Sequence, residues 1–377
     1  MAGEQMGSDR RIVSRGLWGC KGNFWKRKGG TRTAVCVTVL LTGLFALLFE
    51  DAIESWSIAL GRSRGVPGMW TVDPHVGFLS PPREYLLMPS PLVCQRAKPH
   101  LIVMVTSAPG HRHARRVIRD TWGGETDVRG RRVMTFFAVG QSLDPELSKQ
   151  LVQEAQDHGD LVQGRFLDTY ANLTLKTLSV LGWVRRFCPE VPFVAKVDDD
   201  VLFNSAVLLR YLNRSHGADS DLYLGRVHMR VAPKRNPTSR HYLPALSYSP
   251  EVFPDYCSGT AYVLSRSAAH KIFQAAASLP LPDPLPPEDV FVGLSALEAK
   301  ITPYHCPLFS GGPGVPYSRC CYQAMVSVHH TSPAEMVRFW QEMRSAPSCS
   351  WLRMKVSLGI CKVRGLLGTL LGGKEEE

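Results

Sequence analysis

Continuous apolar runs alternate with helical patterns across the centre of the chain. Leu101–Val105 is apolar throughout, which is typical of a strand buried on both faces. Val133–Val139 and Phe193–Val197 are mostly apolar and are also predicted strands. Between these runs, Glu146–Gln156 and Asn172–Phe187 carry apolar residues at helical spacing. The alternation predicts an α/β fold with a mostly parallel sheet and helices on both faces, in which ligands bind beyond the carboxyl ends of the strands.

The second half of the chain has a less regular pattern. Leu222–Gly225 and Ala261–Leu264 are predicted strands, and Ala268–Ala277 is a predicted helix. The basic segment Arg226–Pro250 is predicted to consist mostly of loops. A proline-rich connection then leads into the acidic pair Glu288–Asp289, which makes this pair a candidate site at the start of another element.

An uncharged apolar run, Thr33–Phe49, follows a strongly basic segment. Residues 1–32 carry +6 of the formal net charge of +11. The run would span roughly 25 Å as a helix, the short end of a membrane span. The pattern predicts a cytosolic tail at 1–32 and one transmembrane signal-anchor helix at 33–49, with the remainder on the lumenal side. A cleaved signal peptide is the alternative, although its basic segment would be unusually long.

The remainder is predicted to have three parts. Residues 50–96 are rich in Pro, Gly, Ser and Arg and are predicted to be a stem, residues 97–345 carry the strand and helix patterns, and residues 346–377 form a C-terminal extension. The extension is amphipathic if helical, with basic residues beside an apolar stripe. It either lies in a membrane interface or packs on the body as a terminal helix.

Cysteines and glycosylation sequons agree with an oxidising compartment. Eight cysteines follow the predicted anchor, and they lack the paired spacing of a zinc site, so several disulfides are expected with a connectivity that the sequence leaves open. Two sequons begin at Asn172 and Asn213, which are predicted glycosylation sites.

Three consecutive carboxylates, Asp198–Asp200, follow a buried strand directly. Adjacent buried anions repel one another and lose hydration, which a cation placed among them would offset. Mg²⁺ and Mn²⁺ prefer oxygen ligands and often combine carboxylates with substrate phosphates. The triplet therefore predicts a metal that binds a diphosphate. A solvated acidic turn that caps a helix is the alternative.

Five blocks in order resemble the motifs of the β-1,3-galactosyltransferases of glycosyltransferase family 31. They are Arg116–Gly123, Asn172–Thr177, Lys196–Val201, Cys257–Tyr262 and Glu288–Gly293. The resemblance covers roughly residues 100–340. It implies that 97–345 is a catalytic domain of the GT-A type, with a Rossmann-like sheet, that transfers a sugar with inversion.

The resemblance also implies roles for individual residues. Inversion requires one general base for the acceptor hydroxyl, for which Asp289 is the candidate, and Glu288 either takes that role or orients the acceptor. Asp200 is implied as the direct ligand of Mn²⁺ or Mg²⁺, and His329 as a second ligand. For Asp289 a carboxylate that merely favours a helix N-terminus, and for His329 a packed or surface histidine, are the alternatives.

A further set is implied to surround the donor. Its members are Arg116, Arg119, Lys176, Asp198, Asp199, Gly259 and Tyr262. Arginine suits phosphate because of its bidentate fork. The alternative for Arg119 is that it packs the first helix of the body onto the sheet.

Three segments, Leu222–His228, Arg319–Tyr322 and Cys349–Trp351, resemble the ganglioside-acting members of the family. They imply transfer of galactose from UDP-galactose to the 3-hydroxyl of a terminal N-acetylgalactosamine on ganglioside GM2, which gives GM1, and on its asialo and disialo analogues. The expected partners are the donor, the glycolipid, the Golgi membrane and other glycosyltransferases. Nucleic acid is not expected, because the basic charge is concentrated beside the predicted anchor.

Three other functions compete with this interpretation. A β-1,3-N-acetylglucosaminyltransferase of the same family would share all five blocks. A catalytically inactive glycan-binding module would usually have lost the acidic triplet or the later Glu-Asp pair, and both are present. A calcium-dependent adhesion domain fits poorly, because three adjacent aspartates do not provide the spaced ligands of an EF-hand loop.

Overall fold

The computed structural model describes residues 37–39, 41–43, 45–46, 48–61, 84–215, 217, 220–279, 284–312 and 314–372. The chain divides into two compact units, Met1–Ala46 and Leu47–Glu377. In the first unit, the described residues are helical. All elements described below belong to the second unit.

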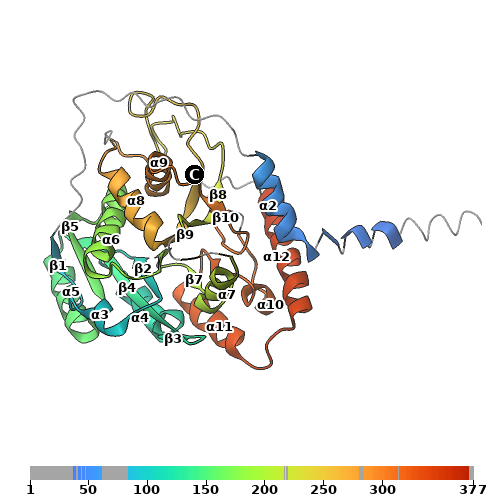
Figure 1. The fold of residues 1–377 in the computed structure, drawn as a ribbon, viewed down its shortest axis with the longest axis horizontal. Helices are drawn as coiled ribbons and strands as arrows, with labels where there is room; N and C mark the ends of the chain where they lie inside the picture. The colour runs from blue at the N-terminus through green and yellow to red at the C-terminus, as the bar shows by residue number, and fades with distance from the viewer. Residues whose placement is uncertain are drawn as a thin grey trace, which may run out of the picture. The chain divides into compact units, whose positions relative to one another are not determined.

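A nine-stranded sheet forms the centre of this unit (Figure 1). Its strands are β1 (Tyr85–Leu87), β2 (Leu101–Thr106), β3 (Asp127–Val128), β4 (Arg131–Gln141), β5 (Leu161–Leu167), β6 (Phe193–Asp198), β8 (Tyr223–His228), β9 (Tyr256–Ser265) and β10 (Tyr304–His305). The order is β1-β5-β4-β2-β6-β9-β8-β10, with β3 paired to β4. The central strands β5, β4, β2 and β6 are parallel, and β9 is antiparallel to both β6 and β8. This confirms an α/β fold with a mostly parallel central sheet.

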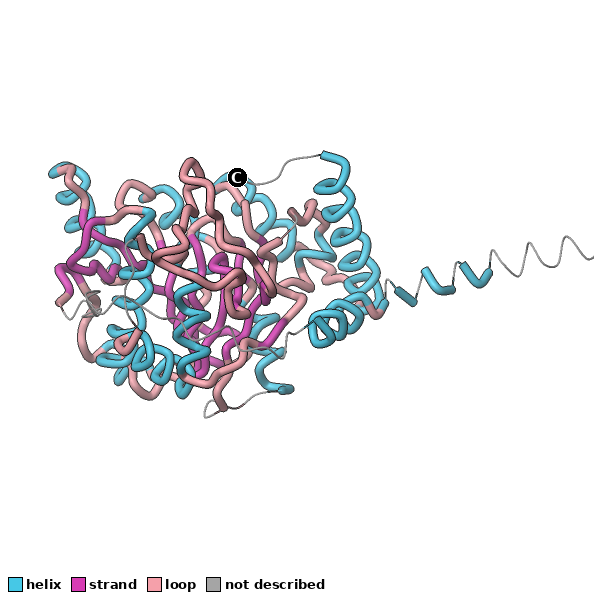
Figure 2. The backbone as a smooth tube through the Cα atoms, turned by 90° about the horizontal axis from the view of Figure 1, so that it is seen from above, coloured by secondary structure: helices cyan, strands magenta, loops and turns pink. Residues whose placement is uncertain are grey.

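Helices pack around this sheet, and a small two-stranded sheet lies beside it (Figure 2). The α-helices are α2 (Glu50–Gly61), α3 (Val93–Ala97), α4 (Arg112–Asp120), α5 (Pro145–His158), α6 (Leu173–Phe187), α7 (Ser205–Ser215), α8 (Arg266–Ala276), α9 (Glu288–Glu298), α10 (Arg319–Tyr322), α11 (Pro333–Arg344) and α12 (Trp351–Gly372). The small sheet pairs β7 (Leu202–Phe203) with β11 (Ser327–Val328), antiparallel. Short 3₁₀ helices occupy Trp122–Gly124 and Tyr170–Asn172.

The core lies on both faces of β2, whose first five residues are completely buried. Alternate residues of a strand point to opposite faces. Leu101 and Val103 accordingly belong to a cluster that includes residues of α4, α7 and α11, whereas Ile102 and Met104 belong to a cluster with α6. The continuous apolar pattern of β2 is thus explained by helices on both sides of the sheet.

Residues 50–96, for which the sequence predicted a stem, contain α2 and β1 and all but the last residue of α3. β1 pairs with β5, and Cys94 in α3 forms a disulfide with Cys188 after α6. The packed body therefore includes residues before the predicted boundary at 97, while 62–83 lie outside the described residues.

The predicted anchor at 33–49 lies partly outside the described residues, which omit 33–36, 40, 44 and 47. Among the described residues, no helix combines the length and the apolar character needed to cross a membrane. The predicted tail at 1–32 lies entirely outside them.

Three disulfides confirm the expectation from the cysteine pattern. They are Cys94–Cys188, Cys320–Cys349 and Cys321–Cys361. The last two join α10 to the start and the middle of the C-terminal extension, where Leu358 and Cys361 are buried. The extension is therefore a helix that packs on the body, although part of its apolar surface is exposed.

Candidate active site

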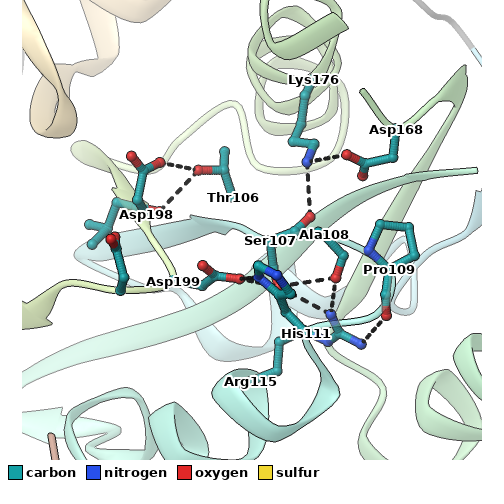
Figure 3. Close-up of polar contacts among 12 residues, drawn as sticks. Thr106, Ser107, Ala108, Pro109, His111, Arg115, Asp168, Lys176, Asp198 and Asp199 are labelled. Atoms are coloured by element: carbon teal, nitrogen blue, oxygen red, sulfur yellow. Dashed lines mark hydrogen bonds and ion pairs between the residues drawn. The ribbon is translucent and has the colours of Figure 1, made fainter. Parts of the chain in front are cut away.

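The acidic triplet lies where two parallel strands end side by side. β2 and β6 are in register with Thr106 opposite Asp198. Thr106 Oγ1 donates to Asp198 Oδ1 at 2.6 Å, and Ser107 Oγ donates to Asp199 Oδ2 at 2.6 Å (Figure 3). His111 Nδ1 lies 2.9 Å from the same Asp199 oxygen. Two of the three carboxylates are thus held at the carboxyl end of the sheet, where α/β proteins bind ligands.

A buried arginine in α4 fixes the loop that follows β2. Arg115 donates to Ser107 Oγ at 3.1 Å, to the Ala108 carbonyl at 2.6 Å and to the Pro109 carbonyl at 3.1 Å. Its remaining donors bind both oxygens of Glu154, at 2.9 and 2.7 Å, and both side chains are 1% exposed. Arg115 therefore orients the hydroxyl that holds Asp199. Arg115 was not among the predicted site residues.

The two arginines predicted to surround the donor lie elsewhere on α4. Arg116 is 79% exposed and lies 3.7 Å from Asp120. Arg119 donates to Glu154 at 2.7 Å and to Asp160 at 2.7 and 2.9 Å. The structure therefore favours the packing alternative for Arg119, and it places Arg116 on the surface beside Asp120. A helix turns about 100° per residue, so neighbouring arginines point in different directions.

Arg115→Ala is expected to lower the free energy of unfolding by about 3–5 kcal/mol, because it removes one partner of a buried ion pair. The adjacent Arg116→Ala is the matched control and should change it by no more than about 0.5 kcal/mol, since that side chain is exposed. Denaturant unfolding of both variants measures the difference. Equal effects would show that Arg115 does not hold this part of the fold.

Lys176 supports the same loop from α6. Its ammonium donates to the Ser107 carbonyl and to Asp168 Oδ1, both at 2.9 Å (Figure 3). Lys176 and Asp168 are both buried. Burial lowers the pKa of Lys176, although the charge of Asp168 opposes the effect. Lys176, a predicted donor-site cation, is thus buried against the loop that follows β2, and its charge is paired with Asp168.

The third carboxylate of the triplet lies close to two histidines that come about 130 residues later in the sequence. Asp200 Oδ2 lies 3.2 Å from His329 Nε2 and 4.0 Å from His330 Nδ1. Ligand atoms of all three residues lie within 4.8 Å of one another. The predicted pair of Asp200 and His329 is thus brought together, and the structure adds His330 to it.

The small sheet explains why these residues converge. β7 starts two residues after Asp200, and β11 ends one residue before His329, and these strands pair. The Thr331 N–H donates to the Asp200 carbonyl at 2.8 Å, and the His329 N–H donates to Ser310 Oγ at 2.8 Å. The backbone thereby fixes both ends of the cluster.

The donor set of this cluster fits a transition-metal dication. Two imidazoles suit first-row transition metals better than Ca²⁺, which takes oxygen ligands, and the carboxylate is a ligand type that Mn²⁺ accepts. Burial raises the pKa of Asp200, but the hydrogen bond to His329 and the nearby His330 outweigh this and hold it below its ordinary value. The carboxylate is therefore ionised and able to act as a ligand near neutral pH.

Asp289 lies in the first turn of α9. Its Oδ2 accepts from the Gly259 N–H at 3.0 Å, and its Oδ1 accepts from the Val290 N–H at 2.9 Å. Burial, together with the charge of the adjacent Glu288, raises the pKa of Asp289 to about 6. A Cβ added to Gly259 would lie 3.3 Å from the Asp289 carboxylate, so glycine permits this close approach. A carboxylate with this pKa is suited to accept a proton near neutral pH.

The carboxylate of Glu288 contacts three other side chains of the protein. Its Oε1 accepts from Thr177 Oγ1 at 2.7 Å and from Tyr262 OH at 3.0 Å, and its Oε2 lies 3.5 Å from Lys196 Nζ. Glu288 is 8% exposed and Tyr262 is 1% exposed. These contacts favour positioning roles for both residues over the base and donor-site roles that the resemblance implied.

Lys196 joins the acidic triplet to the α9 pair. Its ammonium donates to Asp198 Oδ1 at 2.7 Å and to the Gly259 carbonyl, and it faces Glu288. Burial lowers its pKa, but the charges of Asp198 and Glu288 outweigh burial and raise it, so the group stays charged. Lys196 was not among the predicted site residues. The signal was a lysine in an otherwise apolar strand that leads into the aspartates.

Two cavities of about 420 and 790 Å³ lie away from this network. Both are lined by Cys188, Pro189 and Val191, just before β6 begins. The triplet follows the other end of β6, roughly 20 Å along a six-residue strand. These cavities therefore do not coincide with the candidate chemistry.

The predicted glycosylation sites differ in their surroundings. Asn213 is exposed on α7. Asn172 is half-buried before α6, and its side-chain amide donates to the Leu167 carbonyl at 2.9 Å. Attachment of a glycan at Asn172 would require that amide to leave its partner. Occupancy of both sites stays a prediction.

Comparison with known proteins gives consistent matches. A family described as Galactosyltransferase matches residues 113–307. The chain is 37% identical over 376 residues to rat Beta-1,3-galactosyltransferase 4, covering 90% of this chain and 96% of that protein. It is 37% identical over 378 residues to human Beta-1,3-galactosyltransferase 4, covering 89% and 97%. Human Beta-1,3-galactosyltransferase 9 is 32% identical over 280 residues, covering 74% and 75%. The matched family region includes the acidic triplet and Asp289.

Proposed function

This chain belongs to the galactosyltransferase family, and we propose that it is an inverting β-1,3-galactosyltransferase that uses UDP-galactose as its donor. The proposed acceptor is the 3-hydroxyl of a terminal N-acetylgalactosamine on a glycolipid. Ganglioside GM2, converted to GM1, is the first choice, and its asialo and disialo analogues are the next. The names of the relatives support β-1,3-galactose transfer, and the three segments around Leu222–His228, Arg319–Tyr322 and Cys349–Trp351 support the glycolipid.

One observation carries the proposal. The site contains two carboxylates with different surroundings, Asp200 and Asp289, which suit different chemical roles. Asp200 lies beside two histidines in a set that fits a dication. Asp289 has its pKa raised to about 6 and lies in the first turn of α9. Lys196 connects the two regions through Asp198 and Glu288. Such a pair of differently tuned carboxylates suits leaving-group stabilisation at one and proton removal at the other.

The reaction follows from these positions. The oxygen of the acceptor 3-hydroxyl attacks the anomeric carbon of galactose, while the bond from that carbon to the diphosphate oxygen breaks and its electron pair leaves with UDP. The hydroxyl proton passes to Asp289. A dication held by Asp200, His329 and His330 would supply Lewis-acid stabilisation of the departing diphosphate. Asp198 and Asp199, fixed by Thr106 and Ser107, are proposed to contact the donor ribose or the hydration shell of that dication.

The full-length protein incubated with radiolabelled nucleotide sugars tests this function. UDP-galactose should label GM2 in the presence of Mn²⁺, and the labelled product should carry a β-1,3-linked galactose. Faster use of UDP-N-acetylglucosamine would instead support the N-acetylglucosaminyltransferase alternative. Binding of the glycan without transfer from either donor would support a glycan-binding module.

The loop between β8 and β9 offers a further test of the acceptor. Burial raises the pKa of Tyr170, and the charge of Asp289 adds to this effect while that of Arg240 opposes it. Arg240 lies 5.7 Å above the Tyr170 ring, and His241 Nδ1 lies 3.0 Å from the Tyr170 hydroxyl. Arg240 is exposed and cationic, so it is placed to attract an acidic sugar near Asp289. Arg240→Ala is expected to raise the KM for GM2 about tenfold and to leave that for asialo-GM2 unchanged, because only GM2 carries sialic acid. Equal changes for both acceptors in steady-state assays would remove this role.

We also propose that the protein is a single-pass type II protein of the Golgi membrane. The basic tail before Thr33–Phe49, the three disulfides and the sequons support a lumenal catalytic body. The glycolipid acceptor and other glycosyltransferases would be its partners there. Protease protection of the body in sealed Golgi vesicles tests this topology.

A further inference from the structure

The C-terminal helix α12 has two unlike faces. Leu358 and Cys361 are buried against the body, and a Cβ added to Gly365 would meet the Gly314 carbonyl. On the opposite side, exposed apolar residues recur at helical spacing over four turns. They are Leu352 (53% exposed), Ile360 (37%), Val363 (47%), Leu366 (51%) and Leu367 (48%). The body therefore covers only one side of an apolar helix.

The helix α2 repeats this arrangement. Ile53 (45% exposed), Trp56 (66%) and Leu60 (65%) follow one another at spacings of three and four residues, so they share one face. Glu54 lies on another face of the same helix and points into the body. Its carboxylate accepts from Arg226 of β8 at 2.8 Å and lies 3.5 Å from His305 of β10. A partly buried ion cluster thus holds α2 while leaving its apolar stripe exposed.

The two helices are joined to each other. Lys362 of α12 donates to Glu54 of α2 at 2.8 Å. Figure 1 shows the two helices side by side at one edge of the body. Cys361, next to Lys362, is fixed to α10 by its disulfide. The α2 and α12 stripes consequently lie on neighbouring helices at one edge of the body, and we call the two stripes together the α2–α12 face.

We propose that the α2–α12 face lies on the lipid bilayer and holds the catalytic body against the membrane that contains its acceptor. α2 begins at Glu50, immediately after the predicted anchor Thr33–Phe49, so the chain leaves the bilayer where α2 starts. Arg353 and Arg364 flank the apolar stripe of α12 on one side, and Lys355 on the other. Basic side chains beside an apolar stripe are the pattern of helices that lie in a membrane interface. The inference rests on the proposed membrane anchor and not on the reaction.

Photocrosslinking of the full-length protein in nanodiscs of phosphatidylcholine and phosphatidylserine tests this contact directly. The photoreactive residue p-benzoylphenylalanine replaces Val363 in one variant. In the matched control it replaces Val152, an apolar residue of α5 that is 43% exposed, close to the 47% of Val363. With radiolabelled lipid, the variant at position 363 should incorporate about tenfold more label than the control, as expected for a side chain buried in the interface.

The crosslinked products distinguish what contacts the α2–α12 face. Equal lipid labelling at the two positions would overturn the proposal. An adduct of twice the protein mass from position 363 would assign the face to a second copy of this chain, and an adduct with another protein would assign it to a partner. Neither result would depend on catalytic activity.

A functional experiment then measures the consequence for the acceptor. In Val363→Glu/Leu367→Glu, two charges replace apolar contacts with lipid, so the KM for GM2 embedded in the bilayer should rise about tenfold. Transfer to the water-soluble oligosaccharide of GM2 should stay unchanged, as should both activities of the control Val152→Glu. Unchanged KM for embedded GM2 would contradict the proposal. Wild-type protein that labels lipid but transfers galactose to neither acceptor would refute the proposed function and leave the membrane contact intact.

Discussion

Asp289→Asn is expected to lower kcat for galactose transfer by about 10²–10⁴-fold, the usual contribution of a positioned general base. The amide retains the shape of the carboxylate and can still accept from the Gly259 N–H, but it cannot take the acceptor proton. Binding of UDP and Mn²⁺ should be unchanged, because Asp289 lies outside the cluster of Asp200 with its histidines. Steady-state transfer assays and calorimetric titration with UDP measure the two properties separately.

The pH profile makes this prediction specific. A base must be ionised, and the pKa of Asp289 in the free protein is raised to about 6, so kcat/KM in the wild type should be level above that pH. Each pH unit below about 6 should then lower kcat/KM about tenfold, because the protonated fraction is inactive. In Asp289→Asn the residual rate should lack this acidic limb.

The exposed carboxylate Asp157 provides a matched control. Asp157→Asn makes the same chemical change at the end of α5 and should retain both the rate and the acidic limb. Full transfer by Asp289→Asn would move the base elsewhere. In that case Glu288 would be tested next, although its oxygens already accept from Thr177 and Tyr262.

The sequence predicts those elements whose local residue pattern matches their burial in the fold. The run Leu101–Val105 is apolar throughout because helices cover both faces of β2. α5 begins after Asp144, which caps it, and ends at Gly159 in a left-handed conformation. Such signals depend on nearby residues, so they are visible in the sequence.

The strand β5 was not predicted, and its composition explains why. Gln163 and Gly164 interrupt its apolar pattern at the centre. In the fold, the Gln163 side chain donates to the Gly140 carbonyl at 2.9 Å, and a Cβ added to Gly164 would crowd Phe166 and Ser179. Partners that are distant in sequence satisfy these residues, so no local pattern indicates a buried strand.

In the candidate site, too, some residues could be predicted from the sequence and others could not. The motif resemblance identified Asp200 and Asp289, whose surroundings fit the implied roles, but it favoured Arg116 over Arg115. Helical spacing from the buried Ile118 and Trp122 places position 115 on the inner face of α4, and that signal could have identified it. The lysine within an apolar strand was a visible signal for Lys196, but its partners were not visible, because the bridge from Asp198 to Glu288 depends on the meeting of β6, β9 and α9.

Asp200→Ala is expected to abolish the Mn²⁺-dependent part of transfer, a loss of at least about 10²-fold, because Lewis-acid stabilisation of a leaving group is worth several kcal/mol. Asp200 is the carboxylate of the cluster with His329 and His330, and the two imidazoles alone form an incomplete set. Chelation of the wild type with EDTA should cause the same loss, and added Mn²⁺ should restore the wild type but not the variant.

Direct measurement of Mn²⁺ binding by electron paramagnetic resonance distinguishes a lost ligand from a misfolded site. Asp200→Ala should weaken Mn²⁺ affinity, and His329→Ala should do so more than His330→Ala, since His329 Nε2 lies closer to Asp200 and is less exposed. Asp157→Ala, which removes an exposed carboxylate of the same kind, should bind and turn over as the wild type does. If Asp200→Ala binds Mn²⁺ normally and transfers galactose at the wild-type rate, the dication lies elsewhere. The pairing of β7 with β11 would then serve only to stabilise the fold. Asp200 would have no role as a metal ligand, and its proximity to the histidines would no longer support the proposed reaction.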